Sequence, residues 1–235
     1  MISIKHYYYE LRYRLLREWW SLFDTPNNVY CDVLMFHHVS DTHVDINESC
    51  QCTRAQFSNI LSERLEHGYQ FINIGQLSEN MRLNVKGKYC SVTFDDVPDN
   101  FYANALPILE KFQIPFCLFI TTDFMNKPGY LSPKDVLSLS THPLCTIGAH
   151  TITHPQLRYC GNSYNELKLS KEELERIIGK DVRYLAYPYG RQSSISHKVR
   201  AEAKKIGYEL AFSTIPTSIN PLSKNSKFFL PRMLK

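Results

Sequence analysis

The chain has 235 residues, of which 43% are hydrophobic and 21% are charged, and its net charge at pH 7 is +4. This balance excludes an intrinsically disordered chain and provides enough apolar side chains for a sizeable core. The length suits one α/β domain, and no Gly-, Ser- or Pro-rich linker divides the chain. The charge is too small, and the basic residues too dispersed, to indicate nucleic-acid binding.

The first 28 residues are predicted to form an amphipathic helix, distinct from a main domain at residues 29–235. An apolar and aromatic stripe at helical spacing carries this prediction, with arginines beside it: Ile4, Tyr8, Leu11, Leu15, Trp19 and Leu22, with Arg12, Arg14 and Arg17. Such a helix can lie on an anionic membrane surface, or it can pack against the main domain or a second subunit. The segment lacks the apolar core of a signal peptide, and no later run reaches transmembrane length.

The main domain is predicted to begin with a buried strand at residues 33–36, which His37 and His38 follow directly. If the strand continues, the two histidines face opposite sides of the sheet, because strand residues alternate. Thr53 and Gln56 have the spacing of a capping box, which predicts a helix that ends at Gly68.

Residues 88–94 are typical of a buried strand and place Asp95 and Asp96 at its carboxyl end, where α/β enzymes carry their chemistry. The chain turns at a strand end, so both carboxylates can face one cavity. One of them could then bind a metal ion while the other accepts a proton. The alternative is that the pair only caps a helix that begins near Pro98.

A short apolar strand at residues 144–147 leads through Gly148 to His150 and His154. We expect this pair on a loop, because Pro155 disfavours helical geometry at the residue before it. Two imidazoles and one carboxylate make three protein ligands and leave a position for water, as in catalytic zinc sites. Either motif alone is often incidental, but both motifs at strand ends indicate metal-assisted hydrolysis.

Further strands are predicted near residues 71–74, 116–121, 182–187, 210–213 and 228–230, and a helix is predicted at residues 165–178. This alternation favours a mainly parallel, barrel-like sheet. The seven cysteines include no Cys-x-x-Cys pair and do not indicate a disulfide framework. A cytoplasmic location is therefore predicted, either free or peripheral to the inner face of the membrane through the N-terminal helix.

Three ordered motifs between Asp32 and Arg232 resemble those of the polysaccharide deacetylase family, also called the NodB homology domain or carbohydrate esterase family 4. They are Thr93-Phe-Asp-Asp96, Gly148-Ala-His-Thr-Ile-Thr-His-Pro-Gln-Leu157 and Tyr187-Pro-Tyr-Gly190. The resemblance implies an irregular (β/α) barrel of about seven mainly parallel strands in a single α/β domain.

The resemblance also implies roles for individual residues. Asp95 is the general base, and the ligands of a divalent metal, commonly zinc, are Asp96, His150 and His154. The backbone N–H of Tyr189 faces the developing oxyanion, because Pro188 and Gly190 fix a tight turn. An ordinary strand-to-helix turn is the alternative for this last motif.

The chain departs from the best-known family pattern at three places. Val97 stands where glycine is usual, Ala186 stands where many members carry an arginine that pairs with the catalytic aspartate, and the C-terminal Leu-x-His motif is absent from a chain that ends at Lys235. The permuted-motif subset with an Ala-Tyr-Pro-Tyr-Gly third motif is the most similar. That similarity implies that Arg232 supplies the arginine and that His37 is the general acid.

The expected function is metal-dependent N-deacetylation of an N-acetylated sugar, in a surface polysaccharide or in its lipid- or nucleotide-linked precursor, with release of acetate and a free amino sugar. One alternative is an O-acetyl esterase or another amidohydrolase on the same fold. A second alternative is a catalytically impaired glycan-binding protein, which the three departures favour. The expected partner is an N-acetylated carbohydrate, and the oligomeric state is left open.

Overall fold

The computed structural model describes residues 28–42, 50–224 and 226–234, together with Leu11, Arg14, Leu15, Glu18 and Trp19. Most of the predicted N-terminal helix at residues 1–28 lies outside these described residues, so its packing and its membrane contact stay predictions. Among the helices that are described, none combines the length and the apolar character needed to cross a bilayer.

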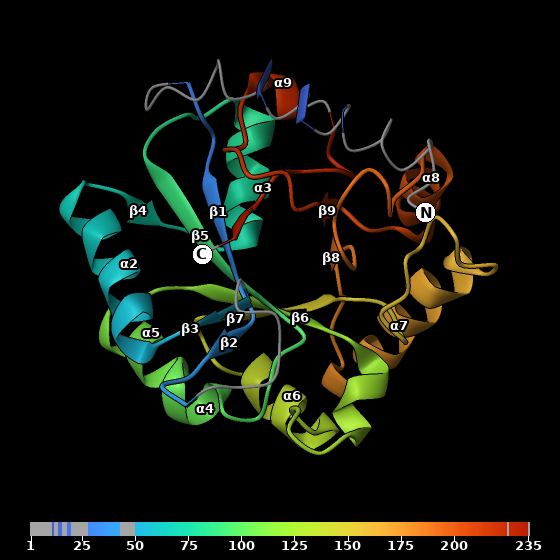
Figure 1. The fold of residues 1–235 in the computed structure, drawn as a ribbon, viewed down its shortest axis with the longest axis horizontal. Helices are drawn as coiled ribbons and strands as arrows, with labels where there is room; N and C mark the ends of the chain where they lie inside the picture. Colours follow the sequence, from blue (N-terminus) through green and yellow to red (C-terminus); the bar gives the residue numbers. More distant parts are fainter. Residues whose placement is uncertain are drawn as a thin grey trace.

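A parallel sheet forms the centre of the fold, with helices around it (Figure 1). The order of its main path is β10-β1-β5-β6-β7-β8-β9, and β4 pairs with the start of β5. The strands are β1 (Asp32–Phe36), β4 (Gln70–Phe71), β5 (Tyr89–Asp95), β6 (Phe116–Ile120), β7 (Cys145–Ala149), β8 (Tyr184–Ala186), β9 (Leu210–Phe212) and β10 (Met233–Leu234). Every one of these pairings is parallel, which confirms the predicted α/β fold of about seven mainly parallel strands.

The C-terminal segment joins the two edges of this sheet. Leu230 donates its N–H to Ala211 of β9, and Ser213 donates back to the carbonyl of Leu230. A few residues later, Met233 pairs with Leu34 of β1. The strand predicted at residues 228–230 is therefore only a single bridge, and the paired strand β10 lies further along the chain.

The helices cover the outside of the sheet (Figure 1). They are α2 (Arg54–Glu66), α3 (Ile74–Leu83), α4 (Phe101–Asn104), α5 (Leu106–Lys111), α6 (Pro133–Ser140), α7 (Ser163–Ile178), α8 (His197–Ile206) and α9 (Pro221–Lys224), with a 3-10 helix η2 (Thr122–Asn126). The predicted capping box is confirmed, because Thr53 and Gln56 exchange side-chain and backbone hydrogen bonds at the start of α2. The strand predicted at residues 71–74 is largely wrong, since a second capping box at Asn73 starts α3 instead.

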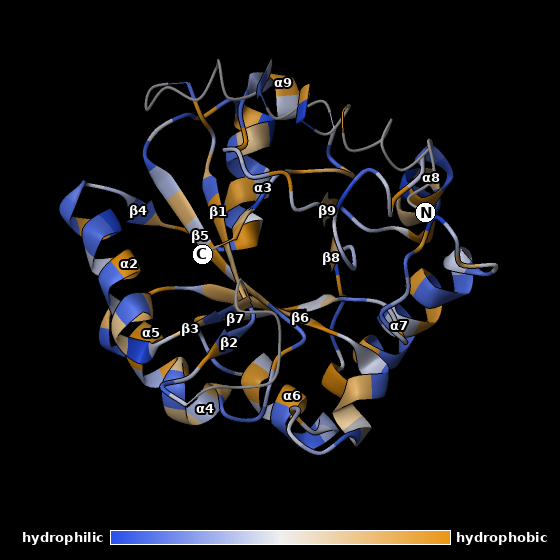
Figure 2. Cartoon of the chain, viewed as in Figure 1, coloured by the Kyte–Doolittle hydropathy of each residue, from blue (hydrophilic) through white to orange (hydrophobic). Residues whose placement is uncertain are grey.

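Side chains alternate along the strands between an outer and an inner apolar layer. Phe36 and Phe94 pack in the outer layer, toward the helices, with ring centroids 5.6 Å apart. Phe119 and Phe212 pack in the inner layer at 5.7 Å. In Figure 2 the strands carry mostly hydrophobic colour, while the surrounding helices carry both hydrophobic and hydrophilic residues. Asp95 follows Phe94 and therefore faces the inner side of the sheet.

Candidate active site

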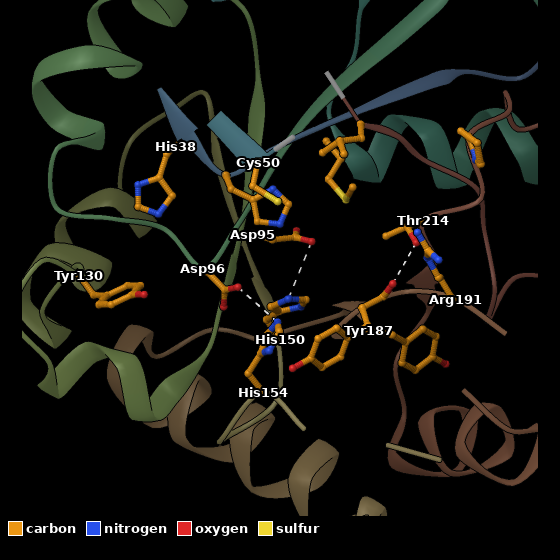
Figure 3. A pocket seen from close by; sticks show the side chains of 15 residues that line it. His38, Cys50, Asp95, Asp96, Tyr130, His150, His154, Tyr187, Arg191 and Thr214 are labelled. Atoms are coloured by element: carbon orange, nitrogen blue, oxygen red, sulfur yellow. Dashed lines mark hydrogen bonds and ion pairs between the residues drawn. The ribbon is translucent and has the colours of Figure 1, made fainter. Parts of the chain in front are cut away.

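A cavity of about 570 Å³ lies at the carboxyl ends of the strands (Figure 3). The lining residues come from the carboxyl ends of the strands and from the segments between elements: Met35, His37, His38, Cys50, Asp95, Asp96, Tyr130, His150, His154, Tyr187, Tyr189, Arg191, Thr214, Pro216 and Leu234. The structure thus brings together most of the residues that the sequence singled out. Arg232 lies behind this lining, in contact with Asp95.

Asp95 is buried and paired with Arg232. Nη1 and Nη2 of the guanidinium donate to the two carboxylate oxygens at 2.7 Å each, and Nη1 also contacts the hydroxyl of Thr93. The guanidinium packs near the ring of Phe119, 5.4 Å from its centroid. Burial alone would raise the pKa of Asp95, but the charge of Arg232, with help from His150, holds that pKa well below its usual range. Asp95 is therefore an ionised carboxylate beside the cavity.

Asp96, His150 and His154 form a cluster whose ligand atoms all lie within 4.8 Å of one another. The Nδ1 atom of His150 is 2.8 Å from the carbonyl of Ala186, which fixes that nitrogen as a donor and leaves Nε2 as the ligand atom. Oδ1 of Asp96 accepts from the hydroxyl of Thr121 at 2.7 Å, while Oδ2 lies 3.3 Å from Nε2 of His154. Two imidazole nitrogens and one carboxylate oxygen suit zinc or a similar divalent cation.

The loop that carries the two histidines is held from one side by α7. The carboxylate of Glu166 accepts from the backbone N–H groups of Ile152 and Thr153 at 3.0 Å and from the hydroxyl of Thr153 at 2.9 Å. Thr151 and His154 have φ values of 70° and 60°, in the left-handed region that non-glycine residues rarely adopt. The loop is thus neither a helix nor a strand, and its strained backbone is fixed by Glu166.

Asp96 also has a positive φ, at 48°, whereas Val97 is not among the described residues with this conformation. The left-handed conformation in this turn is therefore adopted by Asp96 and not by residue 97, so position 97 does not need a glycine. Val97 is 3% exposed and packs in the outer core, and its carbonyl accepts from Leu131 at 3.3 Å. Its side chain adds core packing without opposing the turn.

The third motif forms a tight turn after β8. Tyr189 has a φ of 62°, is 51% exposed, and its ring centroid lies 5.0 Å from that of His154. Gly190 has a φ of 61°, and a Cβ added there would lie 2.3 Å from Cγ2 of Thr214. Thr214 also closes the turn, because its N–H donates to Gly190 and its hydroxyl donates to Tyr189. Only glycine fits at this point of the turn.

His37 and His38 both line the cavity, and the opposite orientations expected if the strand continued do not arise. The reason is that β1 ends at Phe36, the chain bends at His37, and a new short strand, β2 (His38–Val39), begins beside β3 (Gln51–Cys52). Burial lowers the pKa of His37, and the charges of Asp95 and Asp96 oppose this effect. His37 thus lies beside the carboxylate pair.

Sequence reasoning assigned no role to Thr121, Tyr130, Cys50 or Arg191. Of these residues, Thr121 was the easiest to predict from the sequence. It directly follows β6, the strand next to β5, and the carboxyl ends of neighbouring parallel strands lie at the same edge of a sheet. Tyr130 and Cys50 lie on segments between elements, and no periodicity in the sequence directs such segments toward the cavity.

Comparison with known proteins agrees with these motifs. The profile of a family described as polysaccharide deacetylase matches residues 82–211. The poly-beta-1,6-N-acetyl-D-glucosamine N-deacetylase of Staphylococcus aureus (strain MRSA252) is 26% identical over 203 residues, which cover 77% of this chain and 67% of that protein.

Solved structures show the same similarity. The crystal structure of a polysaccharide deacetylase from Bacillus cereus is 27% identical to this chain, with a TM-score of 0.75, and the match covers 87% of this chain but only 64% of that one. A Streptococcus pyogenes deacetylase solved in complex with acetate has a TM-score of 0.77 at 23% identity, over 89% of this chain and 92% of its own. The latter similarity shows the shared fold.

Proposed function

Because the chain belongs to the polysaccharide deacetylase family, we propose that it is a metal-dependent N-deacetylase acting on an N-acetylated polysaccharide or its lipid- or nucleotide-linked precursor. One observation carries this proposal: a buried, ionised Asp95 lies next to a cluster of metal-ligand type within a single cavity. A lone carboxylate or a lone histidine pair would not support it.

Asp96, His150 and His154 would hold the cation. A divalent cation bound by this donor set supplies Lewis acidity, which favours ionisation of water and polarises the acetamide carbonyl. Asp95 would accept the proton of the attacking water as general base. Its pairing with Arg232 keeps it ionised near neutral pH, so it is ready for that role.

Two further residues would assist hydrolysis, one by stabilising the negative charge on the carbonyl oxygen and the other by supplying a proton. The backbone N–H of Tyr189, in the fixed turn before Gly190, would donate to the carbonyl oxygen as negative charge develops on it. His37, in its protonated form, would donate a proton to the sugar nitrogen as the bond between that nitrogen and the acetyl carbon breaks, and the proton that Asp95 took from the water would then restore it. The products are acetate and a free amino sugar, and the water supplies the oxygen and the protons.

Acetate release tests this proposal. The protein is stripped of metal with a chelator, reloaded with zinc, and incubated with β-1,6-linked N-acetylglucosamine oligomers and with O-acetylated sugars. We expect release from the N-acetyl substrates that chelation abolishes and zinc restores. Release from O-acetyl substrates alone would assign an esterase, and stoichiometric zinc binding without any turnover would contradict an active enzyme.

A separate experiment tests whether the protein acts on a precursor or on the finished polymer. The cytoplasmic location predicted from the cysteine content would favour a precursor over finished polymer. Fractionation of cells followed by antibody detection distinguishes these cases, because a protein found only outside the cytoplasm would assign the finished polymer.

A further inference from the structure

The loop between the two histidines of the metal-ligand cluster, residues 151–153, is bound on one side by η2. The N–H of Thr122 donates to the carbonyl of Thr151 at 3.1 Å, and the N–H of Asp123 donates to the carbonyl of Ile152 at 3.0 Å. These two bonds satisfy carbonyl groups of the loop. The N–H groups of the loop need acceptors of their own, because buried or half-buried backbone donors are nearly always paired.

The carboxylate of Glu166 supplies those acceptors from the other side. Its Oε2 atom accepts from the N–H groups of Ile152 and Thr153, each at 3.0 Å, and its Oε1 atom accepts from the hydroxyl of Thr153 at 2.9 Å. Successive N–H groups that converge on one oxygen in a turn form a concave anion site of the kind called a nest. Here the anion in the nest is a side chain of the protein itself.

The start of α7 presents this carboxylate to the loop. Glu166 lies in the first turn of the helix, where the positive end of the helix dipole favours a carboxylate. Asn162 caps the same turn, because its side-chain oxygen accepts from the N–H of Asn165 at 3.3 Å. The next residue, Leu167, has no exposed surface and packs in the outer apolar layer. Glu166 is therefore held by a helix start that is itself capped and packed.

The backbone of His154 needs such an anchor. His154 has a φ of 60°, and its N–H donates to the hydroxyl of Thr151 at 3.1 Å. Left-handed conformations are unfavourable for residues other than glycine and persist only where the surroundings fix them. Thr151 has a φ of 70° and meets the same condition.

We propose that Glu166 is a positioning residue that holds this loop in its metal-binding geometry before a cation arrives, and that it thereby sets the affinity of Asp96, His150 and His154 for the metal. Ligands that are already in place when the cation arrives bind it more tightly than ligands that must first be ordered. Glu166 does not line the cavity, so it takes no part in proton transfer. The proposal rests on the proposed function, because it takes these three residues as the metal ligands.

The first test measures zinc affinity by competition with a chromophoric chelator. Glu166→Ala removes the acceptor of two loop N–H groups, so we expect zinc affinity to fall by about tenfold or more. Glu166→Gln keeps a side-chain oxygen at the same reach and should retain most of the affinity. An unchanged zinc affinity in Glu166→Ala would overturn the proposal.

Hydrogen exchange in the metal-free protein tests whether Glu166 orders the loop beyond its own bonds. The N–H groups of Thr122, Asp123 and His154 donate to acceptors in the loop and not to Glu166. We expect all three to exchange about tenfold faster in Glu166→Ala, because exchange reports local opening. Wild-type exchange rates at all three would show that the loop is ordered without Glu166 and would overturn the proposal.

Two variants of the same helix are the matched controls. Asn162→Ala removes the cap of α7 but leaves the carboxylate of Glu166 in place. Glu172→Ala removes an exposed carboxylate that pairs with Lys168 at 3.3 Å, and so controls for the loss of one negative charge. Both should bind zinc as the wild type does. An equal fall in zinc affinity in either control would assign the effect to helix stability or to net charge and overturn the proposal.

The dependence of acetate release on free zinc keeps this result apart from the proposed activity. The deficit of Glu166→Ala should disappear once zinc saturates the weakened site, since the residue acts through metal affinity alone. A low kcat that persists at saturating zinc would overturn this restricted role. If the wild type released no acetate, the proposed function would fail, while zinc affinity and hydrogen exchange would still decide the role of Glu166.

Discussion

Arg232 donates two hydrogen bonds of 2.7 Å to the two carboxylate oxygens of Asp95, although 137 positions separate the residues in the sequence. Arg232 has no exposed surface, and Asp95 is 2% exposed. The arginine reaches the site from the segment that closes the sheet between β9 and β1. The family pattern often has an arginine at the position of Ala186. In this chain the positive charge beside Asp95 comes from Arg232, which directly precedes β10.

Removal of Arg232 should affect stability and activity together. Arg232→Ala leaves the carboxylate of Asp95 buried without its charge partner, so we expect a loss of about 3–5 kcal/mol in the free energy of unfolding. Arg232→Lys should recover only part of this loss, because an ammonium cannot form the two parallel hydrogen bonds. Urea unfolding and acetate release measure the two effects.

A surface pair provides the matched control for this prediction. Arg183 pairs with Glu209 while 55% and 29% of their side chains are exposed, so Arg183→Ala should cost less than about 1 kcal/mol and leave activity intact. Equal losses in Arg183→Ala and Arg232→Ala would contradict the importance of the buried pair.

The same pair predicts how stability depends on pH. Burial opposes ionisation of Asp95, but Arg232 and His150 hold its pKa below the unfolded value of about 4. A group with a depressed folded pKa contributes stability that is complete above the unfolded pKa and is lost as pH falls toward the folded one. Urea unfolding between about pH 5 and pH 2 should therefore show a steeper loss in the wild type than in Asp95→Asn. If the free energy of unfolding fell equally with pH in the wild type and in Asp95→Asn, the lowered pKa of Asp95 would be contradicted.

Local signals in the sequence explain why so much of the fold was predictable. Thr53 and Gln56 satisfy the backbone donors at a helix start, and Gly179 adopts the left-handed conformation that ends α7. The closure of the sheet by β10 was not predictable, because a strand of this length carries no periodicity. The same holds for α3, whose capping residue Asn73 follows apolar residues that also suit a strand.

In the candidate site, too, the residues in local motifs were predictable and those placed by tertiary pairing were not. Asp95, Asp96, His150 and His154 belong to compact motifs at strand ends, so their meeting in one cavity followed from parallel topology. The side-chain direction of His38 depended on where β1 stops, and that point is set by the pairing of β2 with β3. Tertiary pairing of this kind leaves no mark in the sequence near His38.

Thr121 should tune the affinity for metal. Its hydroxyl donates to Oδ1 of Asp96 at 2.7 Å, which orients the carboxylate and leaves the other oxygen free to bind a cation. Thr121→Val keeps the shape of the side chain but removes this donor, so zinc affinity should fall roughly 10- to 100-fold. Competition with a chromophoric chelator measures the change, and Thr122→Val, at the next buried hydroxyl, is the control. An unaltered zinc affinity in Thr121→Val would refute the orienting role.

The turn after β8 should tolerate no side chain at Gly190. A Cβ there would lie 2.3 Å from Cγ2 and 2.6 Å from the backbone nitrogen of Thr214, and its φ of 61° is also unfavourable for alanine. We expect Gly190→Ala to lose about 1–3 kcal/mol of stability and to reduce acetate release, since Tyr189 would move with the turn. Gly161→Ala is the matched control, because no atom lies within 4 Å of a Cβ at that position.

His37 is expected to act as an acid, and this role can be separated from that of a base by the choice of leaving group. An amine must be protonated as it leaves, whereas 4-nitrophenolate leaves without a proton. His37→Ala should therefore lower kcat for N-acetyl substrates by about 100-fold or more, with a change of only about threefold for 4-nitrophenyl acetate.

Asp95→Asn provides the contrast to His37→Ala, because loss of the base slows attack by water on both substrates. The two variants should thus differ in their ratio of amide to ester hydrolysis, with the ratio collapsing only when His37 is removed. If His37→Ala lowered both rates equally, the histidine at the end of β1 would serve the attack or the shape of the cavity, and another residue would protonate the amine.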